Sequence, residues 1–237
     1  MLRNVFVVVL VLGVTLCAKP VHATLLQLSD YSSDGSVYNA AEYLSADLDF
    51  TVVAATLTLI VTNNTFNNYP STNQTAFNIS ELFFNIPTDG RVSNLALSEV
   101  WELNASGVKI DGEKKTKWDN YTAVTVDNKA NGFGLFDVLV KGDTPSNVIA
   151  PRDTSGVYAV KFVFAISGTG PFSSDDFTTY MSAPFDNNRL GLAAGKFVSG
   201  GPSGNESAYG VVVPEPATIA LLGLGGLTLL GIRKKKR

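Results

Sequence analysis

The stretch LDFTVVAATLTLIVT, residues 48–62, decides the fold of this chain. In its second half Leu57, Leu59 and Val61 are separated by Thr or Ile, and this period of two predicts a β-strand with one buried face. The alternation slips at the Val-Ala-Ala of residues 53–55. The stretch therefore forms either two strands joined there or one strand with a bulge.

Shorter apolar segments follow along the chain, separated by clusters of Gly, Pro, Asn or Asp. They are residues 79–86, 95–103, 123–126, 135–140, 158–166 and 190–198. Tyr158, Phe162 and Phe164 share one face of their segment and are expected in the core, whereas Lys161 lies on the other face. No long segment has helical periodicity, and short strands between turns are typical of an antiparallel sandwich. We predict an all-β domain here, a β-sandwich of jelly-roll-like form.

The first residues predict a signal peptide. An uncharged apolar run over residues 5–16 follows a positive start. Pro20 then ends the helical segment, and small residues lead to a cleavage site between Ala23 and Thr24. Lipid attachment at Cys17 is the rival, but a large residue precedes that cysteine where a small one is required. We expect export by the Sec translocon and cleavage by signal peptidase.

The other end of the chain predicts a membrane segment. An apolar stretch over residues 217–232 is followed by the basic cluster Arg233, Lys234, Lys235, Lys236 and Arg237. Such a cluster stays on the cytoplasmic side and acts as a stop-transfer signal, so the stretch predicts a single transmembrane helix with the preceding domain outside. Just before it, Pro214 and Pro216 impose an extended backbone around Glu215, which is typical of an accessible recognition site.

This order of a Pro-Glu-Pro motif, an apolar Gly/Leu segment and a basic end resembles the sorting tail of the PEP-CTERM family, the substrates of exosortases. The resemblance covers residues 213–237 only. It implies that an exosortase recognises Pro214, Glu215 and Pro216, cleaves nearby and delivers the protein to the envelope or the extracellular polymer matrix. A plain single-span anchor is the alternative.

The sequence thus predicts four segments. Residues 1–23 are the signal peptide, 24–198 the β-sandwich ectodomain, 199–212 a flexible linker rich in Gly and Ser, and 213–237 the sorting signal. The linker would hold the folded domain clear of the sorting motif.

Composition excludes several classes of function. Cys17 and His22 are the only cysteine and histidine, and both are lost with the signal peptide. Ser-His-Asp and Cys-His catalysis, Cys/His metal sites and disulfides are therefore excluded, and we expect no enzymatic activity. A pair of carboxylates for glycoside cleavage is the remaining enzymatic option.

Of the 18 basic residues, 11 lie between the two terminal signals, against 20 of the 21 acidic ones. A net charge of about −9 disfavours nucleic acid as a partner.

Two kinds of ligand site remain open in the ectodomain. Asp175, Asp176 and Asp186 are weak candidates for calcium binding, and the alternative is that they cap and solvate turns. Trp118 and Tyr121 are candidates for stacking on a sugar, together with Trp101, and the alternative is that they belong to the core. Otherwise we expect no cofactor.

The favoured function is that of an exported bacterial structural or interaction protein of the cell surface or extracellular matrix, associated with biofilm or exopolysaccharide. It is anchored in the membrane by its C-terminal helix until the exosortase processes it. The alternative is a displayed carbohydrate-binding module or, less favoured, a glycan-cleaving enzyme, with extracellular polysaccharide as its partner.

Overall fold

The computed structural model describes residues 23–29, 44–65, 76–110, 112, 114–122, 128–152, 156–184, 190–200 and 206–212. The sorting motif, the expected membrane helix, the basic cluster and the strand candidate 123–126 lie outside these ranges. Within them, no helix has the length and apolar character needed to cross a membrane.

The described chain is almost entirely antiparallel β-structure, so the all-β prediction is confirmed. The strands are β1 (Ala23–Ser29), β2 (Ser45–Val53), β3 (Thr56–Asn63), β4 (Asn78–Phe84), β5 (Val92–Leu103), β6 (Lys109–Ile110), β7 (Trp118–Thr122), β8 (Asn128–Ala130), β9 (Gly134–Phe136), β10 (Val138–Gly142), β11 (Ala159–Gly168), β12 (Ala193–Gly200) and β13 (Glu206–Val212). The short helices are η3 (Lys115–Lys117) and α2 (Asp175–Thr178).

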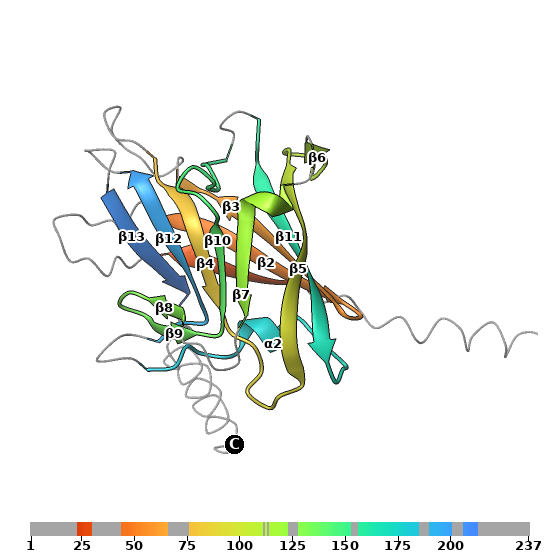
Figure 1. The fold of residues 1–237 in the computed structure, drawn as a ribbon. Helices are drawn as coiled ribbons and strands as arrows, with labels where there is room; N and C mark the ends of the chain where they lie inside the picture. The colour runs from red at the N-terminus through yellow and green to blue at the C-terminus, as the bar shows by residue number, and fades with distance from the viewer. Residues whose placement is uncertain are drawn as a thin grey trace, which may run out of the picture.

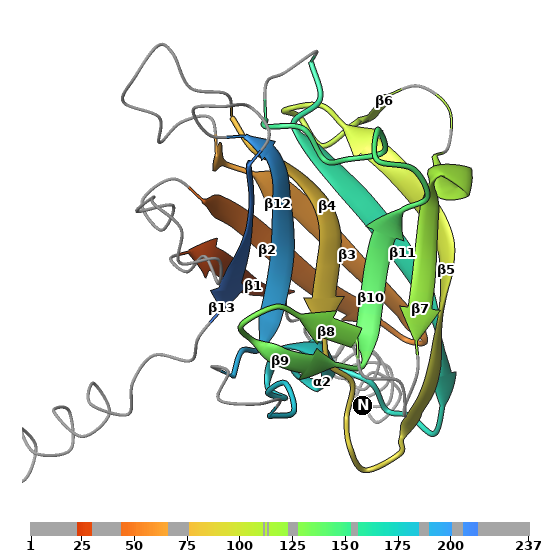
Figure 2. The ribbon, with the colours of Figure 1, turned by 60° about the vertical axis from the view of Figure 1, so that its left-hand side comes forward.

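Eleven of these strands form one sheet in the order β6-β5-β11-β3-β2-β1-β13-β12-β4-β10-β7. The sheet folds over, so that the half from β5 to β1 faces the half from β13 to β7 (Figures 1 and 2). At the far side β5 contacts β7, and Asn120 Nδ2 donates a hydrogen bond to the Leu95 carbonyl oxygen at 2.6 Å. The two halves thus enclose a common core.

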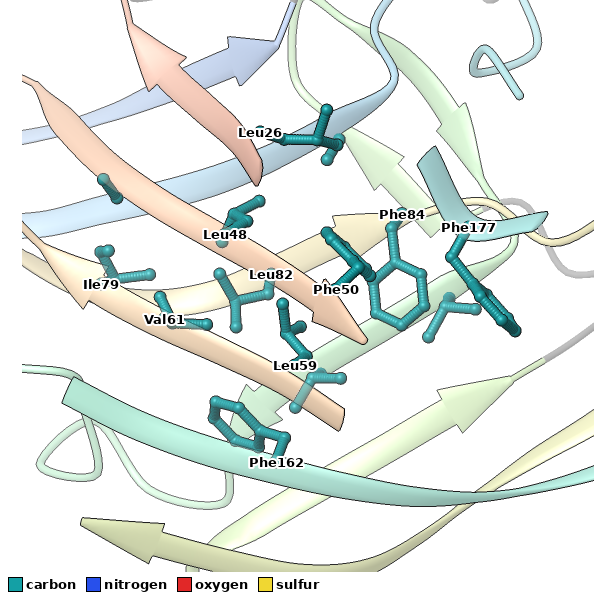
Figure 3. Packing of buried hydrophobic residues seen from close by; sticks show 14 of the residues in the cluster. Leu26, Leu48, Phe50, Leu59, Val61, Ile79, Leu82, Phe84, Phe162 and Phe177 are labelled. Atoms are coloured by element: carbon teal, nitrogen blue, oxygen red, sulfur yellow. The ribbon is translucent and has the colours of Figure 1, made fainter. Parts of the chain in front are cut away.

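Aromatic side chains join the two halves across this core (Figure 3). The Phe84 ring on β4 packs edge-to-face on Phe50 of β2 at 5.5 Å and on Phe164 of β11 at 6.1 Å between centroids. Trp118 of β7 packs on Phe162 of β11 at 5.0 Å. All five are buried, as expected for Phe162 and Phe164, while Tyr158 is only partly buried.

The stretch at residues 48–62 forms two strands rather than one bulged strand. Val53 pairs with Thr56, so Ala54 and Ala55 form a two-residue hairpin turn, and Ala54 has a φ of 53°. Burial alternates along both β2 and β3, as the period of two predicts.

The structure differs from the sequence prediction at residues 199–212. In place of a flexible linker, β12 extends to Gly200 and β13 occupies Glu206–Val212. Residues 199–207 are rich in Gly and Ser, and this composition is typical of a linker. The strand β13 nevertheless pairs with β12, and its Ala208, Val211 and Val212 are buried. Strand β1, at the expected cleavage site, was also not anticipated.

A second, smaller core lies on the outer face of the β13–β7 half. The β8–β9 hairpin covers Phe83, Ala194 and Val211 there, and the candidate strand 135–140 divides at Asp137 into β9 and β10. The Asp137 carboxylate accepts a hydrogen bond from the Ile86 backbone nitrogen at 3.1 Å.

Candidate functional site

The two terminal strands carry the chain to its processing signals. The Val212 carbonyl oxygen, at the end of β13, accepts a hydrogen bond from the Leu192 nitrogen at 2.9 Å. Only Val213 separates this residue from Pro214. The fold therefore holds the backbone firmly up to the edge of the expected sorting motif.

Strand β1 is the partner of β13 on its other side. Ser29 pairs with Val211, and β1 also pairs with β2 along its whole length. Because β1 and β13 are antiparallel, the start of β1 and the end of β13 point toward the same end of the sheet. The expected cleavage bond lies between the first two residues of β1, and Thr24 Oγ1 lies 3.0 Å from Ser174 Oγ.

A pocket opens at the other side of the molecule, between β5, β11, η3 and the start of β7. It has a volume of about 90 Å³. Its lining residues are Val100, Glu102, Lys114, Lys117, Trp118, Ser146, Asn147, Val148 and Val160. Val100, Val160 and Trp118 are buried and form an apolar floor, while the charged and polar residues are more exposed and form the rim.

Comparison with known proteins bears on the end of the chain. The family model of the PEP-CTERM protein-sorting motif matches residues 212–237. The chain therefore ends in a PEP-CTERM sorting motif. No curated protein and no solved structure gives a significant match.

The PEP-CTERM motif implies an exported protein that is directed to the cell surface and processed by an exosortase. Its match begins at Val212, the last residue of β13, so the sorting signal follows the folded sheet directly. The motif residues Pro214, Glu215 and Pro216 and the cluster from Arg233 to Arg237 lie outside the described residues.

The aromatic candidates for sugar contact have different environments. Trp118 is only 8% exposed and packs on Phe162, so its ring face belongs to the core, and its remaining exposed surface lines the pocket. The side chain of Tyr121 lies outside the described part of the structure, although its backbone belongs to β7. The Trp118 ring fills the space between β7 and β11, which is the core environment that the sequence left open as the alternative to sugar contact.

Trp101 is the more exposed of the two tryptophans. Its Nε1 donates a hydrogen bond to Glu99 Oε2 at 2.7 Å, and Lys109 Nζ lies 3.7 Å from the ring centroid. The hydrogen bond from Trp101 lowers the pKa of Glu99, and the ammonium groups of Lys109 and Lys161 lower it further. One face of this ring is thus already occupied by a cation.

The calcium candidates have separate roles. Asp176 is buried: its Oδ1 lies 3.0 Å from Arg91 Nη1, and its Oδ2 accepts a hydrogen bond from the Ser173 nitrogen at 2.8 Å. Asp175 is exposed, and Asp186 lies outside the described residues. Among the residues that the structure describes, no three His, Cys, Asp or Glu side chains gather as a metal site would require. Asp176 therefore serves as the anchor of α2.

Sequence reasoning did not anticipate the pocket. In the sequence, Lys114 and Lys117 belong to the charged run of residues 111–117, and Glu102 lies in the expected strand segment 95–103. Glu102 pairs with Val160 and so shares its inward face, which depends on the register of β5 against β11. No local signal in the sequence gives that register.

Proposed function

We propose that this chain is an exported bacterial structural or interaction protein of the cell surface or extracellular matrix, associated with biofilm or exopolysaccharide. In this proposal an exosortase cleaves it near Pro214-Glu215-Pro216. The observation that carries this proposal is the match of residues 212–237 to the sorting motif immediately after β13.

The placement of the terminal strands supports this function. A signal peptide before β1 and a membrane segment after β13 leave the sheet in the same direction, because these neighbouring strands are antiparallel. Both segments can then enter one bilayer without crossing the domain. In the proposed precursor, this end of the sheet faces the membrane, and the remainder of the domain extends away from it.

The proposed role is not enzymatic. In its support, the mature chain has neither cysteine nor histidine once the signal peptide is removed. Four acids that a glycoside-cleaving site might use are each engaged by a different partner: Glu81 by Lys196, Glu99 by Trp101 and Lys109, Glu102 by Lys114, and Asp137 by Ile86.

Replacement of Glu215 by Ala tests the sorting proposal. We expect the variant to accumulate at the length of the precursor without its signal peptide, whereas the unaltered chain yields a shorter surface form, because the extended Pro-Glu-Pro motif loses its only charged group. Intact-mass measurement of the cell-envelope and released fractions gives the result. Glu206→Ala is the matched control, since it removes the nearest preceding acid and leaves the motif intact.

A processed form of unchanged mass from Glu215→Ala would contradict exosortase recognition of this motif. A full-length chain found in the cytoplasm with both ends intact would contradict export itself.

Carbohydrate binding is the second candidate function. The pocket favours it, because charged, hydroxyl and amide side chains converge there over a floor of Trp118 and two valines that are nearly buried. Binding sites commonly combine an apolar floor with a few convergent polar groups.

A further inference from the structure

The pocket beside Trp118 is the open end of the space between the two halves of the sheet. Val100 and Val160 face inward on β5 and β11 and form its floor. Glu102 also faces inward, two residues beyond Val100, where the strands reach solvent and its side chain is 31% exposed. A carboxylate on the inner face of a sheet requires a compensating group.

Lys114 supplies that compensation. Its Nζ lies 3.7 Å from Glu102 Oε2, and its side chain is 20% exposed. The Lys114 backbone nitrogen also donates a hydrogen bond to the Val100 carbonyl oxygen at 2.9 Å, which attaches the start of η3 to β5. The position of this ammonium is therefore set by the backbone as well as by the ion pair.

Lys117 is a second basic residue at the same rim. Its backbone nitrogen donates to the Lys114 carbonyl oxygen, and its own carbonyl oxygen accepts a hydrogen bond from Asp143. Its side chain is exposed and forms no ion pair with any residue that the structure describes. The residues that line the pocket thus include two lysines and one glutamate, and Lys114 pairs with Glu102 while Lys117 has no ion-pair partner among the described residues.

The opposite rim is polar and held in place. The Asn147 side chain donates hydrogen bonds to Asp143 and to Thr144 Oγ1, and Thr144 Oγ1 lies 2.9 Å from Ser146 Oγ. The Asn147 backbone nitrogen donates to the Thr144 carbonyl oxygen at 3.0 Å. Ser146 and Asn147 therefore present hydroxyl and amide groups to the pocket from a fixed turn.

We propose that this pocket binds the carboxylate of an acidic sugar, a uronic acid residue, with Lys117 and Lys114 as its cationic contacts. A volume of about 90 Å³ admits a carboxylate and the carbons next to it rather than a whole oligosaccharide. The small exposed part of Trp118 lies beside the sugar carbons, and the Ser146–Asn147 turn faces the hydroxyl groups.

The acidic character of the whole ectodomain is compatible with this ligand. At physiological ionic strength, charges more than about 8 Å away are largely screened, so a single carboxylate in contact with two ammonium groups responds mainly to them. A long polyanion lying along the surface is disfavoured, and a single residue or chain end that enters the pocket is favoured. The proposal deepens the carbohydrate-binding candidate given above and rests on it.

Titration of the full chain in mild detergent tests the proposal. The chain has two tryptophans, so Trp101→Phe leaves Trp118 as the only indole reporter. We expect tetragalacturonate and monomeric galacturonate to change its fluorescence with saturation, and neutral galactotetraose to cause no change. Added salt should weaken the binding, because an exposed charge contact is screened.

Variants locate the site. Lys117→Ala should weaken galacturonate binding roughly tenfold, the effect of losing one charge-assisted hydrogen bond, and Lys117→Arg should retain most of the affinity. Glu102→Gln should strengthen binding a few fold, because it removes a carboxylate that lines the pocket beside Lys114. Lys129→Ala, an exposed lysine on β8, is the control for net charge and should leave binding unchanged.

Three outcomes would overturn the proposal: no binding of either acid, equal binding of galactotetraose, or a Lys117→Ala variant with unchanged affinity. If an equal concentration of acetate displaced galacturonate, the proposal that the pocket recognises a sugar would be wrong. The pocket would then be a general carboxylate-binding site. Any of these results, in a chain that is still sorted and cleaved normally, would leave the proposed sorting function intact.

Discussion

The two ends of β5 carry ion pairs in contrasting environments. Just before its start, Arg91 Nη1 lies 3.0 Å from Asp176 Oδ1, and the Asp176 side chain is 4% exposed. Near its end, Lys114 lies 3.7 Å from a Glu102 side chain that is 31% exposed. Figure 1 shows α2, which carries Asp176, beside one end of β5, and β6 at the other.

The difference follows from what covers each end. At the α2 end, the Asp176 carboxylate also accepts a hydrogen bond from Ser173, and Phe177 is fully buried next to it in the chain. At the pocket end, Glu102, Lys114 and the Ser146–Asn147 turn line an opening to solvent. The same strand therefore ends in a closed structural contact on one side and an accessible site on the other.

Among variants that compare the two ends of β5, the largest loss of stability is expected at Trp118, in the floor of the pocket. Trp118→Ala removes a nearly buried indole that packs on Phe162 and should lower the free energy of unfolding by about 3–5 kcal/mol. Trp101→Ala, the control at the more exposed tryptophan, should cost about 1 kcal/mol, chiefly its contacts with Lys109 and Glu99. Urea denaturation measures both. Equal losses would show that Trp118 is not part of the core and would remove the floor of the pocket.

An intermediate effect is expected at Asp176. Asp176→Ala leaves Arg91 without its buried partner and the Ser173 nitrogen without its acceptor. The free energy of unfolding should therefore fall by about 2–3 kcal/mol. This value is in the lower part of the range for buried pairs because Arg91 is partly exposed. Asp175→Ala is the neighbouring control at an exposed acid.

Glu102→Ala is the counterpart of Asp176→Ala at the pocket end, and its cost should be at most about 1 kcal/mol, as for partly exposed ion pairs. Thermal unfolding of the three variants compares the two ends directly. A loss at Glu102 as large as that at Asp176 would mean that the pocket rim is as structural as the α2 anchor, and the contrast would fail.

The smallest effect is expected at Asp49, a carboxylate that has lost solvent without gaining a full set of partners. Its Oδ1 is buried without a hydrogen-bond partner among the described residues, and burial raises the pKa of this group. The raised pKa means that the ionised form is disfavoured in the folded state. The penalty is present at neutral pH and disappears as the pH falls below the ordinary carboxyl pKa.

Asp49→Asn should therefore stabilise the protein slightly at pH 7, by less than about 1 kcal/mol, and the gain should vanish on acidification. Denaturation midpoints measured across this pH range give the result. Asp47→Asn on the same strand is the control, because Asp47 Oδ1 accepts a hydrogen bond from Gln27 at 3.2 Å. A gain that persists in acid would assign the effect to packing rather than to charge.

Much of the fold could be predicted from local sequence. The strands β2, β3, β4, β5, β11 and β12 each overlap a predicted segment, because alternation of apolar and polar residues is a property of the segment itself. The weaker strands β1, β7 and β13 were not predicted. Residues 206–212 follow a run of Gly, Pro and Ser, and their strand form depends on β12 and β1, which lie beside them in space.

The candidate sites divide in the same way. The sorting motif was predicted because Pro214, Glu215 and Pro216 are adjacent in the sequence and act as a linear signal. For Trp118 the sequence left sugar contact and a core role open, because its burial depends on Phe162, which lies on a strand more than forty residues away in the sequence. Asn63 is similar: its side chain is fully buried and donates to the carbonyl oxygens of Phe77 and Ile149, although it begins a polar loop in the sequence.

The sequence by itself determined that this chain is built from β-strands and that its last residues form a PEP-CTERM sorting signal, because both depend on residues close together along the chain. Only the tertiary structure decided that β13 holds the chain up to the sorting signal, that Asp176 is an anchor, and that Glu102, Lys114 and Lys117 share one pocket. The reason is physical: burial and charge pairing arise where strands distant in sequence meet, and the register of that meeting is set by the whole sheet.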